Sequence, residues 1–199
     1  MKKIKLKDYD KATKELLMTF GLEESTISRI VDTYESLEIK KGKSFLKEGK
    51  KSDKIGLLLS GLLYAYTTDD NGNKNVSRFF YSPENLIVVN LESFIQNKNS
   101  DETIECLEDA YLITIDREAL FNLYIEEPQL NNIGRTLAEE SYIKALKKIK
   151  LLQTKNGRER ILLLREQSPE LFLKVQKSYI ASYLGMHRNT YDKAFKMIR

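Results

Sequence analysis

The sequence predicts an α+β protein in which an N-terminal antiparallel β-barrel with flanking helices is followed by a long helix and a C-terminal helix-turn-helix. Three observations predict this order. Short apolar runs alternate with turn signals from Glu38 to Ile115, a helical pattern runs from Pro128 to about Leu152, and residues Ser178 to Arg199 have the spacing of two short helices joined at a glycine. Many short strands with regular turns are typical of barrels and sandwiches, whereas apolar residues at i, i+3 and i+4 indicate helices.

Residues from about Leu6 to Leu37 are predicted to be helical, because apolar side chains recur there at helical spacing. Turn signals such as Lys41-Gly42 and Ser60-Gly61 then separate the strands of the predicted barrel. The run from Asp69 to Asn73 is predicted to be a hairpin tip with a tight primed turn, since Asn-Gly suits that backbone. Cys106, the single cysteine, lies in the alternating segment TIECLEDAYLITID, so we expect a buried structural thiol and no internal disulfide.

Helical patterning returns at Arg117, and the long helix after Pro128 has an alternating four- and three-residue apolar spacing that resembles a short coiled-coil seam. A homodimer through this seam is the natural inference, and the alternative is a helix packed against its own barrel. Asn156-Gly157 is interpreted as a hinge into the last domain. The predicted domains are a barrel at 1–127, a dimerisation helix at 128–155 and a helix-turn-helix domain at 156–199. The expected dimer-interface residues are Ala138, Tyr142, Ala145, Ile149 and Leu152.

The last twenty-two residues meet the requirements of a helix-turn-helix. Ser178 is expected to cap the first helix, and Ile180 and Leu184 form its inward face. Ala181 is small enough to let the second helix approach. Gly185 supplies the bend, because glycine accepts the left-handed backbone that often follows a helix end.

The second of these helices combines an apolar stripe with a polar opposite face. Arginine bonds guanine bidentately and asparagine bonds adenine, so Arg188 and Asn189 give its first turn the groups that a major groove requires. His187, the single histidine, is expected to contact phosphate or to cap the helix. The alternative is an ordinary helical hairpin with a solvated charged face. The stripe consists of Tyr191, Ala194, Phe195 and Ile198, and the polar face also holds Asp192, Lys193 and Lys196.

Charge is distributed unevenly along the chain. Residues 141–199 contain 14 Lys and Arg against 4 Asp and Glu, whereas residues 1–140 contain 19 against 25. A basic C-terminal part on an acidic body is the pattern expected when one part of a protein meets phosphates. With 41% hydrophobic and 31% charged residues, the 199-residue chain is expected to be globular, with two domains. We expect a cytoplasmic protein with no membrane span, because the start MKKIKLKDYD lacks the apolar stretch of a signal peptide.

The order of these parts resembles the Crp/Fnr family of bacterial transcription regulators over nearly the whole chain, in particular its compact Bacteroidetes-type members. Lys41-Gly42, Glu48-Gly49, Ser60-Gly61 and Gly72 are similar to recurring turns of the cyclic-nucleotide-binding-like jelly-roll barrel of that family. The segment TIECLEDAYLITIDREAL resembles its final strands and exit helix, and ILLLREQSPELFLKVQKSYIASYLGMHRNTYDKAF is similar to its DNA-binding end.

The resemblance implies a homodimer that binds double-stranded DNA at a palindromic operator, with the second helix of each helix-turn-helix in the major groove. The two DNA-reading helices of such a dimer lie about 34 Å apart. RNA polymerase and an unidentified small-molecule effector are further candidate partners, and no cofactor or metal is expected. By motif position, the base-reading candidates are Arg188, Asn189 and Lys193, the candidates near phosphates are Ser178 and Thr190, and the expected DNA-binding set also includes Lys177, His187 and Lys196.

Control by cyclic AMP is not expected. Family members that bind cyclic AMP use a Gly-Glu pair, which orients the ribose, and an Arg before Ser or Thr, which neutralises the cyclic phosphate. Here Ile87 to Val89 stand about where the first pair belongs, and Ser100-Asp101 about where the second belongs. An aspartate without an arginine would repel an anionic phosphate. An iron–sulfur sensor is not expected either, because it would need about four cysteine ligands per cluster and the sequence has one.

The sequence therefore favours a dimeric DNA-binding regulator. The alternative is a ligand-binding or protein-interaction module of the same fold with little DNA activity. Salt-sensitive DNA affinity separates the two, because released counterions make DNA binding fall steeply with salt. An enzyme is not expected, because one histidine, one cysteine and no phosphate-cradling glycine loop give no recognisable catalytic constellation.

Overall fold

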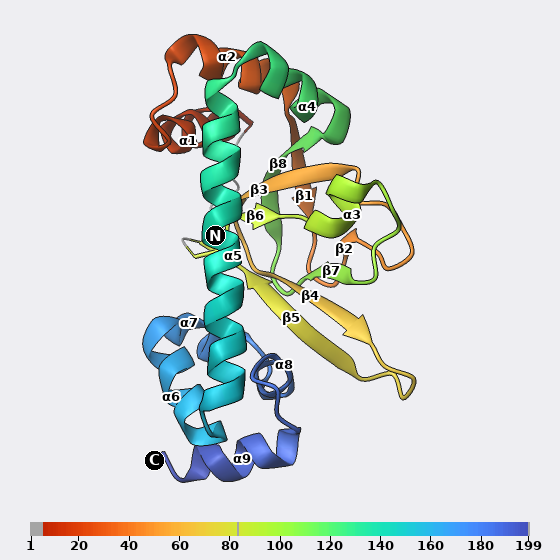
Figure 1. Ribbon diagram of the computed structural model, residues 1–199, viewed down its shortest axis with the longest axis vertical. Coiled ribbons are helices and arrows are strands. Elements are labelled where there is room, and N and C mark those ends of the chain that lie inside the picture. The colour runs from red at the N-terminus through yellow and green to blue at the C-terminus, as the bar shows by residue number, and fades with distance from the viewer. Residues whose placement is uncertain (1–5, 83, 199) are drawn as a thin grey trace. The chain divides into compact units, whose positions relative to one another are not determined.

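The computed structural model describes residues 6–82 and 84–198. Contacts divide the chain into two compact units, one containing residues up to 65 with 79–136 and the other containing 66–78 with 137–199. The division falls inside helix α5 (Gln129–Thr154) and across the hairpin of β4 (Leu63–Thr68) and β5 (Lys74–Phe80), which Figure 1 labels. The sequence-based domain boundaries after residues 127 and 155 stay a prediction.

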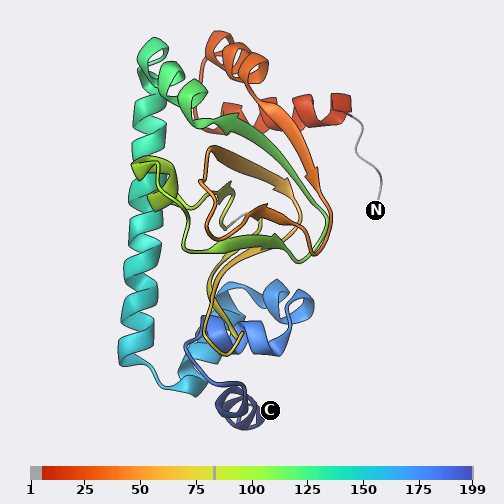
Figure 2. The same cartoon turned by 90° about the vertical axis from the view of Figure 1, so that its right-hand side faces the viewer.

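Two four-stranded sheets form the predicted jelly-roll barrel, and their strands surround a common interior (Figure 2). In the first sheet β8 pairs antiparallel with both β1 and β3, from Glu35 opposite Thr114 to Ile39 opposite Ala110 on the β1 side. The first sheet has the order β1 (Glu35–Ile39), β8 (Ala110–Asp116), β3 (Lys54–Ser60) and β6 (Ile87–Val88). The second sheet has the order β2 (Ser44–Leu46), β7 (Thr103–Cys106), β4 and β5.

Apolar side chains from both sheets fill the barrel. Leu58, Leu63, Ile104 and Leu112 are almost fully buried in one hydrophobic cluster. Cys106 lies in the same cluster, and burial raises the pKa of its thiol to about 12. The expected buried structural thiol is therefore confirmed.

The glycine turns of the barrel are confirmed, since Gly42, Gly49, Gly61 and Gly72 all have positive φ. Gly61 is also required for close approach, because a Cβ there would lie 2.6 Å from the Cα of Ala110.

The expected primed turn at the hairpin tip is wrong. Asp69 accepts from Gly72 N at 2.9 Å and donates to Asn73 O at 3.0 Å, so the tip is a longer loop. A type I′ turn needs positive φ at both central residues, and Asn97 is the one non-glycine residue with positive φ in the described chain. The Asp69 carboxylate accepts instead from the backbone of Asn71 and Asn73, which stabilises the wider turn.

Two local predictions in the first unit need correction. Helices α1 (Leu6–Thr19) and α2 (Glu24–Thr33) are confirmed, but Tyr34 has an extended backbone and Leu37 lies in β1 instead of a helix. A short helix α3 (Leu91–Gln96) interrupts the region predicted as strands only. Asn90 caps α3 by accepting from Ser93 N at 2.8 Å, and this local capping bond favours a helix in a segment whose apolar run indicated a strand.

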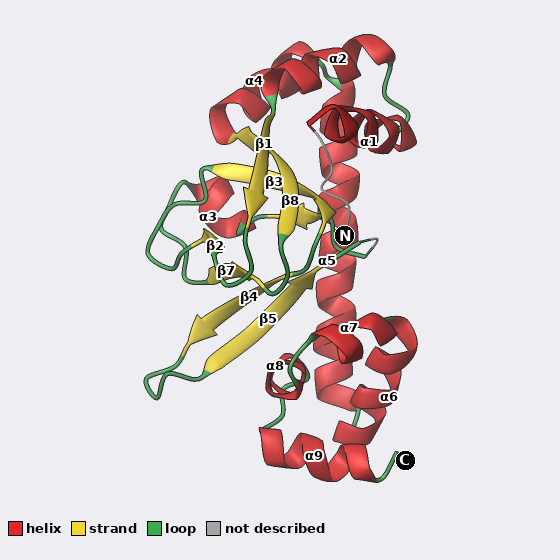
Figure 3. Ribbon diagram, turned by 180° about the vertical axis from the view of Figure 1, so that it is seen from behind, coloured by secondary structure: helices red, strands yellow, loops and turns green. Residues whose placement is uncertain are grey.

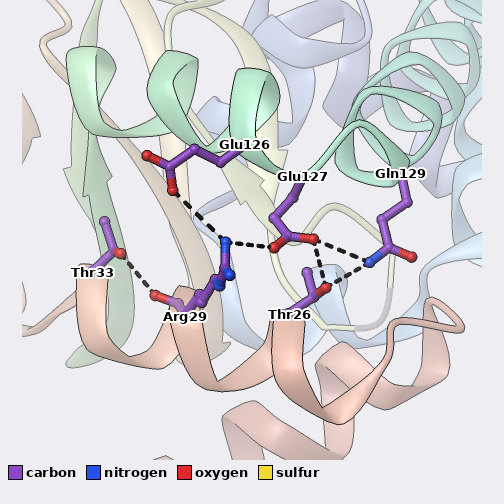
Figure 4. A network of polar contacts seen from close by, with 6 residues as sticks. All are labelled: Thr26, Arg29, Thr33, Glu126, Glu127 and Gln129. Carbon is purple, nitrogen blue, oxygen red and sulfur yellow. Dashed lines mark hydrogen bonds and ion pairs between the residues drawn. The ribbon is translucent and has the colours of Figure 1, made fainter.

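The N-terminal helices pack on α4 (Arg117–Glu126) and on the start of α5, where Leu17, Ile27, Ile30 and Leu123 belong to a second hydrophobic cluster. A polar network covers this contact at the junction of α4 and α5 (Figure 4).

In that network, Thr26 donates to the Glu127 carboxylate at 2.9 Å and accepts from Gln129 Nε2 at 2.5 Å. Arg29 pairs with the other Glu127 oxygen at 2.9 Å. The network therefore ties α2 to the start of the long helix.

The second unit contains the helices of the predicted helix-turn-helix domain (Figure 3). They are α6 (Gly157–Gln167), α7 (Pro169–Lys174), α8 (Lys177–Tyr183) and α9 (Arg188–Lys196), and their buried side chains include Ile161, Leu164, Leu171, Val175, Ile180, Leu184 and Tyr191. Asn156 and Glu159 form a capping box at the start of α6, with both bonds at 3.0 Å. A Cβ at Gly157 would lie 2.8 Å from Met186 Sδ. Asn156-Gly157 is therefore a capped helix start, and its role as a hinge stays a prediction.

Candidate nucleic-acid interface

The bend of the helix-turn-helix is built by Gly185, as predicted. Gly185 has φ of +66°, Met186 N donates to Ala181 O and Gly185 N donates to Ser182 O, both at 2.9 Å. These two bonds are the Schellman pattern, which satisfies carbonyls at the end of α8.

The start of α8 differs from the prediction. The helix begins at Lys177 with Gln176 as its N-cap residue, and Gln176 makes no side-chain capping bond within the described chain. Ser178 therefore lies inside the first turn, where it is half-buried, and is not the cap. Lys177 is exposed, and its ammonium lies 5.7 Å from the centre of the Phe195 ring of α9.

Helix α9 is oriented by its apolar stripe. Tyr191 is 1% exposed and stacks on Phe195 with 5.6 Å between ring centres. His187 is the N-cap residue, with its Nδ1 accepting from Asn189 N at 3.4 Å, so the expected capping role is confirmed.

The opposite face of α9 holds the predicted DNA-binding side chains. Exposed His187, Asn189, Thr190, Lys193 and Lys196 lie on this one element. Arg188 is half-buried, and its Nε donates to Asp192 Oδ2 at 2.7 Å. The structure thus brings most of the predicted set together on α9, with Lys177 and Ser178 on α8.

One residue that supports the helix-turn-helix, Arg160, was not predicted from the sequence. The Arg160 guanidinium of α6 donates to Lys155 O at 2.8 Å, to Leu152 O at the end of α5 and to Leu184 O at the end of α8, the last at 3.0 Å. One cation therefore holds orphan carbonyls of two helix ends. The spacing of side chains along the sequence does not indicate this role, because the partners of Arg160 are backbone carbonyls.

The predicted seam of α5 is largely exposed. Tyr142 is 64% and Ile149 51% exposed, and Ala138 and Ala145 are exposed beside them. Leu152 is half-buried, and a Cβ on Gly185 would lie 3.2 Å from its Cδ2, so Leu152 already packs near the bend. Ile143 and Leu146, which were not predicted, are also exposed apolar residues of α5.

The α3 region, where a cyclic nucleotide would be expected, is occupied by contacts among its own residues. Asn90 Nδ2 donates to Asp101 Oδ1 at 3.2 Å, and Ser100 bonds the backbone of Glu102. Lys98 is the one basic residue between positions 86 and 102, and its ammonium pairs with Glu92. The Arg117 guanidinium of α4 also lies against α3, with its Nε donating to Phe94 O at 2.7 Å.

Across residues 6–82 and 84–198, no group of three or more His, Cys, Asp or Glu is arranged to hold a metal ion. No described helix is both long and apolar enough to cross a membrane.

Comparison with known proteins supports the fold. Residues 36–127 match the family model of the cyclic nucleotide-binding domain, and no curated protein sequence matches significantly.

Several solved structures resemble the chain along most of its length. FixK2 from Bradyrhizobium japonicum is 16% identical with a TM-score of 0.70, covering 83% of this chain and 84% of its own. A putative Crp/Fnr-family regulator from Eubacterium rectale is 18% identical with a TM-score of 0.70, and the match covers 91% of this chain and 85% of that regulator. CLP from Xanthomonas campestris, described as a c-di-GMP-responsive global regulator, is 16% identical with a TM-score of 0.67, covering 88% and 91%.

Proposed function

We propose that this chain, whose residues 36–127 match the family model of the cyclic nucleotide-binding domain and whose fold is similar to that of Crp/Fnr transcription regulators, is a sequence-specific DNA-binding transcription regulator. The observation that carries the proposal is the exposed polar face of α9, which follows a glycine bend and lies opposite an apolar stripe anchored by the buried Tyr191. Such a helix supplies donors and acceptors to base edges, while neighbouring cations meet phosphates. In this proposal, residues 1–127 sense, 128–155 dimerise and 156–199 bind DNA.

Arg188, Asn189 and Lys193 are the proposed base-reading residues. The Arg188 Nε bond to Asp192 holds the guanidinium against α9 and leaves its two terminal nitrogens for a guanine edge. Ser178, Thr190 and the lysines at 177 and 196 are the proposed phosphate contacts.

Selection of a randomised duplex DNA library on the purified protein, at about 150 mM salt, tests this function. Enrichment of a two-fold symmetric site is the expected result. Affinity for that site should also fall steeply with salt, because each neutralised phosphate releases counterions. A protein that binds neither the selected pool nor low-salt duplex DNA would instead be a ligand-binding or protein-interaction module.

We propose a homodimer that forms along the exposed seam of α5. Tyr142 and Ile149 lie seven residues apart on one helix face. The small residue Ala145 lies between them, and Ala138 lies one turn before Tyr142. Pairing of two such seams would bury the apolar side chains and place two copies of α9 for one palindromic operator. Sedimentation equilibrium at micromolar concentration should give twice the chain mass.

We also propose that cyclic AMP does not control the protein. Asp101 and Glu92 place two carboxylates in this region, Lys98 is paired with Glu92, and the Arg117 guanidinium donates to Phe94 O and Ile95 O of α3. Calorimetric titration should detect no binding of cyclic AMP or cyclic GMP. Micromolar affinity for either nucleotide would contradict the proposal.

A further inference from the structure

Strand β5 ends the second sheet, so its outer edge has no neighbouring strand in the order β2-β7-β4-β5. An edge of this kind presents backbone donors and acceptors that need other partners. In the second unit, one hydroxyl supplies both kinds of partner. Ser182 Oγ of α8 accepts from Val76 N at 2.9 Å and donates to Lys74 O at 3.0 Å. A single serine therefore replaces the acceptor and the donor of a missing strand.

A second contact joins the same strand to the long helix. Lys148 of α5 donates from Nζ to Ser77 O at 2.6 Å, and its ammonium lies 3.8 Å from the centre of the Tyr183 ring of α8. We call this contact set, formed by Lys74, Val76 and Ser77 with Lys148 and Ser182, the β5 bracket. The bracket connects α5 to α8 through the strand.

Aromatic contacts extend the bracket along α8. Lys74 Nζ lies 4.1 Å from the centre of the Tyr66 ring of β4 and 5.9 Å from that of Tyr179 of α8. Both strands of the hairpin thus take part, and each of them runs from one compact unit into the other.

We propose that Ser182 is a positioning residue that fixes the helix-turn-helix on β5, so that the β4–β5 hairpin sets the orientation of α9 relative to α5. The inference rests on the proposed DNA-binding function. Two copies of α9 engage one operator together only when each is held at a fixed angle to the dimerising helix. Ser182 lies in the helix before the reading helix and touches no proposed DNA-binding residue in the contacts above.

The experiment compares three full-length variants with the original protein. Ser182→Ala removes the hydroxyl, and Ser182→Thr keeps it. Thr136→Ala is the matched control, because the Thr136 hydroxyl bonds Asn132 O of its own helix at 2.9 Å, outside the bracket. The first readout is the hydrogen-exchange rate of the Val76 amide, measured by NMR. We expect about three- to tenfold faster exchange of the Val76 amide in Ser182→Ala alone. This change corresponds to the loss of one net hydrogen bond. Unchanged exchange at Val76 would overturn the proposal.

The second readout is affinity for the selected operator and for non-specific duplex at low salt. Ser182→Ala should weaken operator binding about tenfold, because the helices are no longer preorganised, and should leave non-specific binding unchanged. Ser182→Thr should restore operator affinity. Equal or tighter operator binding by Ser182→Ala, with faster Val76 exchange, would overturn the positioning role. Failure of the DNA-binding function itself would appear separately, as absent salt-sensitive binding by the original protein.

Discussion

Lys148 provides a stringent test of the contacts around α5, because its charge is held in a poor environment for an ammonium group. Burial and, to a smaller extent, the charge of Arg78 together lower its pKa from the usual 10.5 to about 8. The bond to Ser77 O and the Tyr183 ring compensate only in part. Lys148→Met keeps most of the apolar volume and removes the titrating group.

The sign of the pH effect follows from proton binding. Between pH 8 and 10.5 the unfolded chain keeps the Lys148 proton while the folded protein loses it, so the free energy of unfolding rises with pH in this window. At 1.36 kcal/mol per pKa unit, the difference corresponds to about 3 kcal/mol. The destabilisation is fully present below pH 8 and disappears as the pH passes 10.5.

Urea denaturation of the original protein and of Lys148→Met, from pH 7 to pH 10.5, measures this effect. Other groups titrate equally in both proteins, so the difference between their unfolding free energies isolates Lys148. We expect that difference to shift by about 3 kcal/mol in favour of the original protein as the pH rises. A difference that does not change with pH would refute the argument that the ammonium is buried.

Three further changes test the bend, the reading helix and the seam. Gly185→Ala should lower the free energy of unfolding by about 1–2 kcal/mol, measured by urea denaturation, because φ is +66° and the new Cβ would press on Leu152; full stability would mean that the bend relaxes without strain. Arg188→Ala should cost roughly 1–3 kcal/mol of operator binding in a gel-shift titration and relax the preference at one base pair per half-site, whereas uniform weakening on all sequences would make Arg188 a phosphate contact. Ile149→Glu should weaken the dimer at least about tenfold by sedimentation, since like charges would face each other across the seam, while Lys150→Glu is the control; an intact Ile149→Glu dimer would place the interface elsewhere.

Much of the fold could be predicted from local pattern. The alternating runs from Glu38 to Ile115 correspond to strands, and Tyr191 and Phe195 lie on the buried face of α9 as their spacing indicated. The errors arise where a side chain bonds the backbone nearby and favours a different local structure from the one that the apolar pattern predicts. Asn90 caps an unpredicted helix, and Asn71-Gly72 forms a wider loop because Asp69 binds its backbone.

The candidate site was predicted in part for the same reason. Spacing identifies which side of α9 is polar, so Asn189, Thr190 and Lys193 were found on one exposed face. The pairing of Arg188 with Asp192 is also local, at four residues of separation. Spacing says nothing about which side chains support that face from other elements.

The sequence by itself determined the order of barrel, long helix and helix-turn-helix, the glycine bend and the polar face of α9, because each depends on residues within one or two turns of chain. Only the tertiary structure decided how that helix is held. Arg160 reaches a carbonyl 24 residues away and Ser182 meets a strand 106 residues before it. Their partners are backbone groups, which every residue carries alike, so no pattern of side chains marks such contacts before the chain has folded.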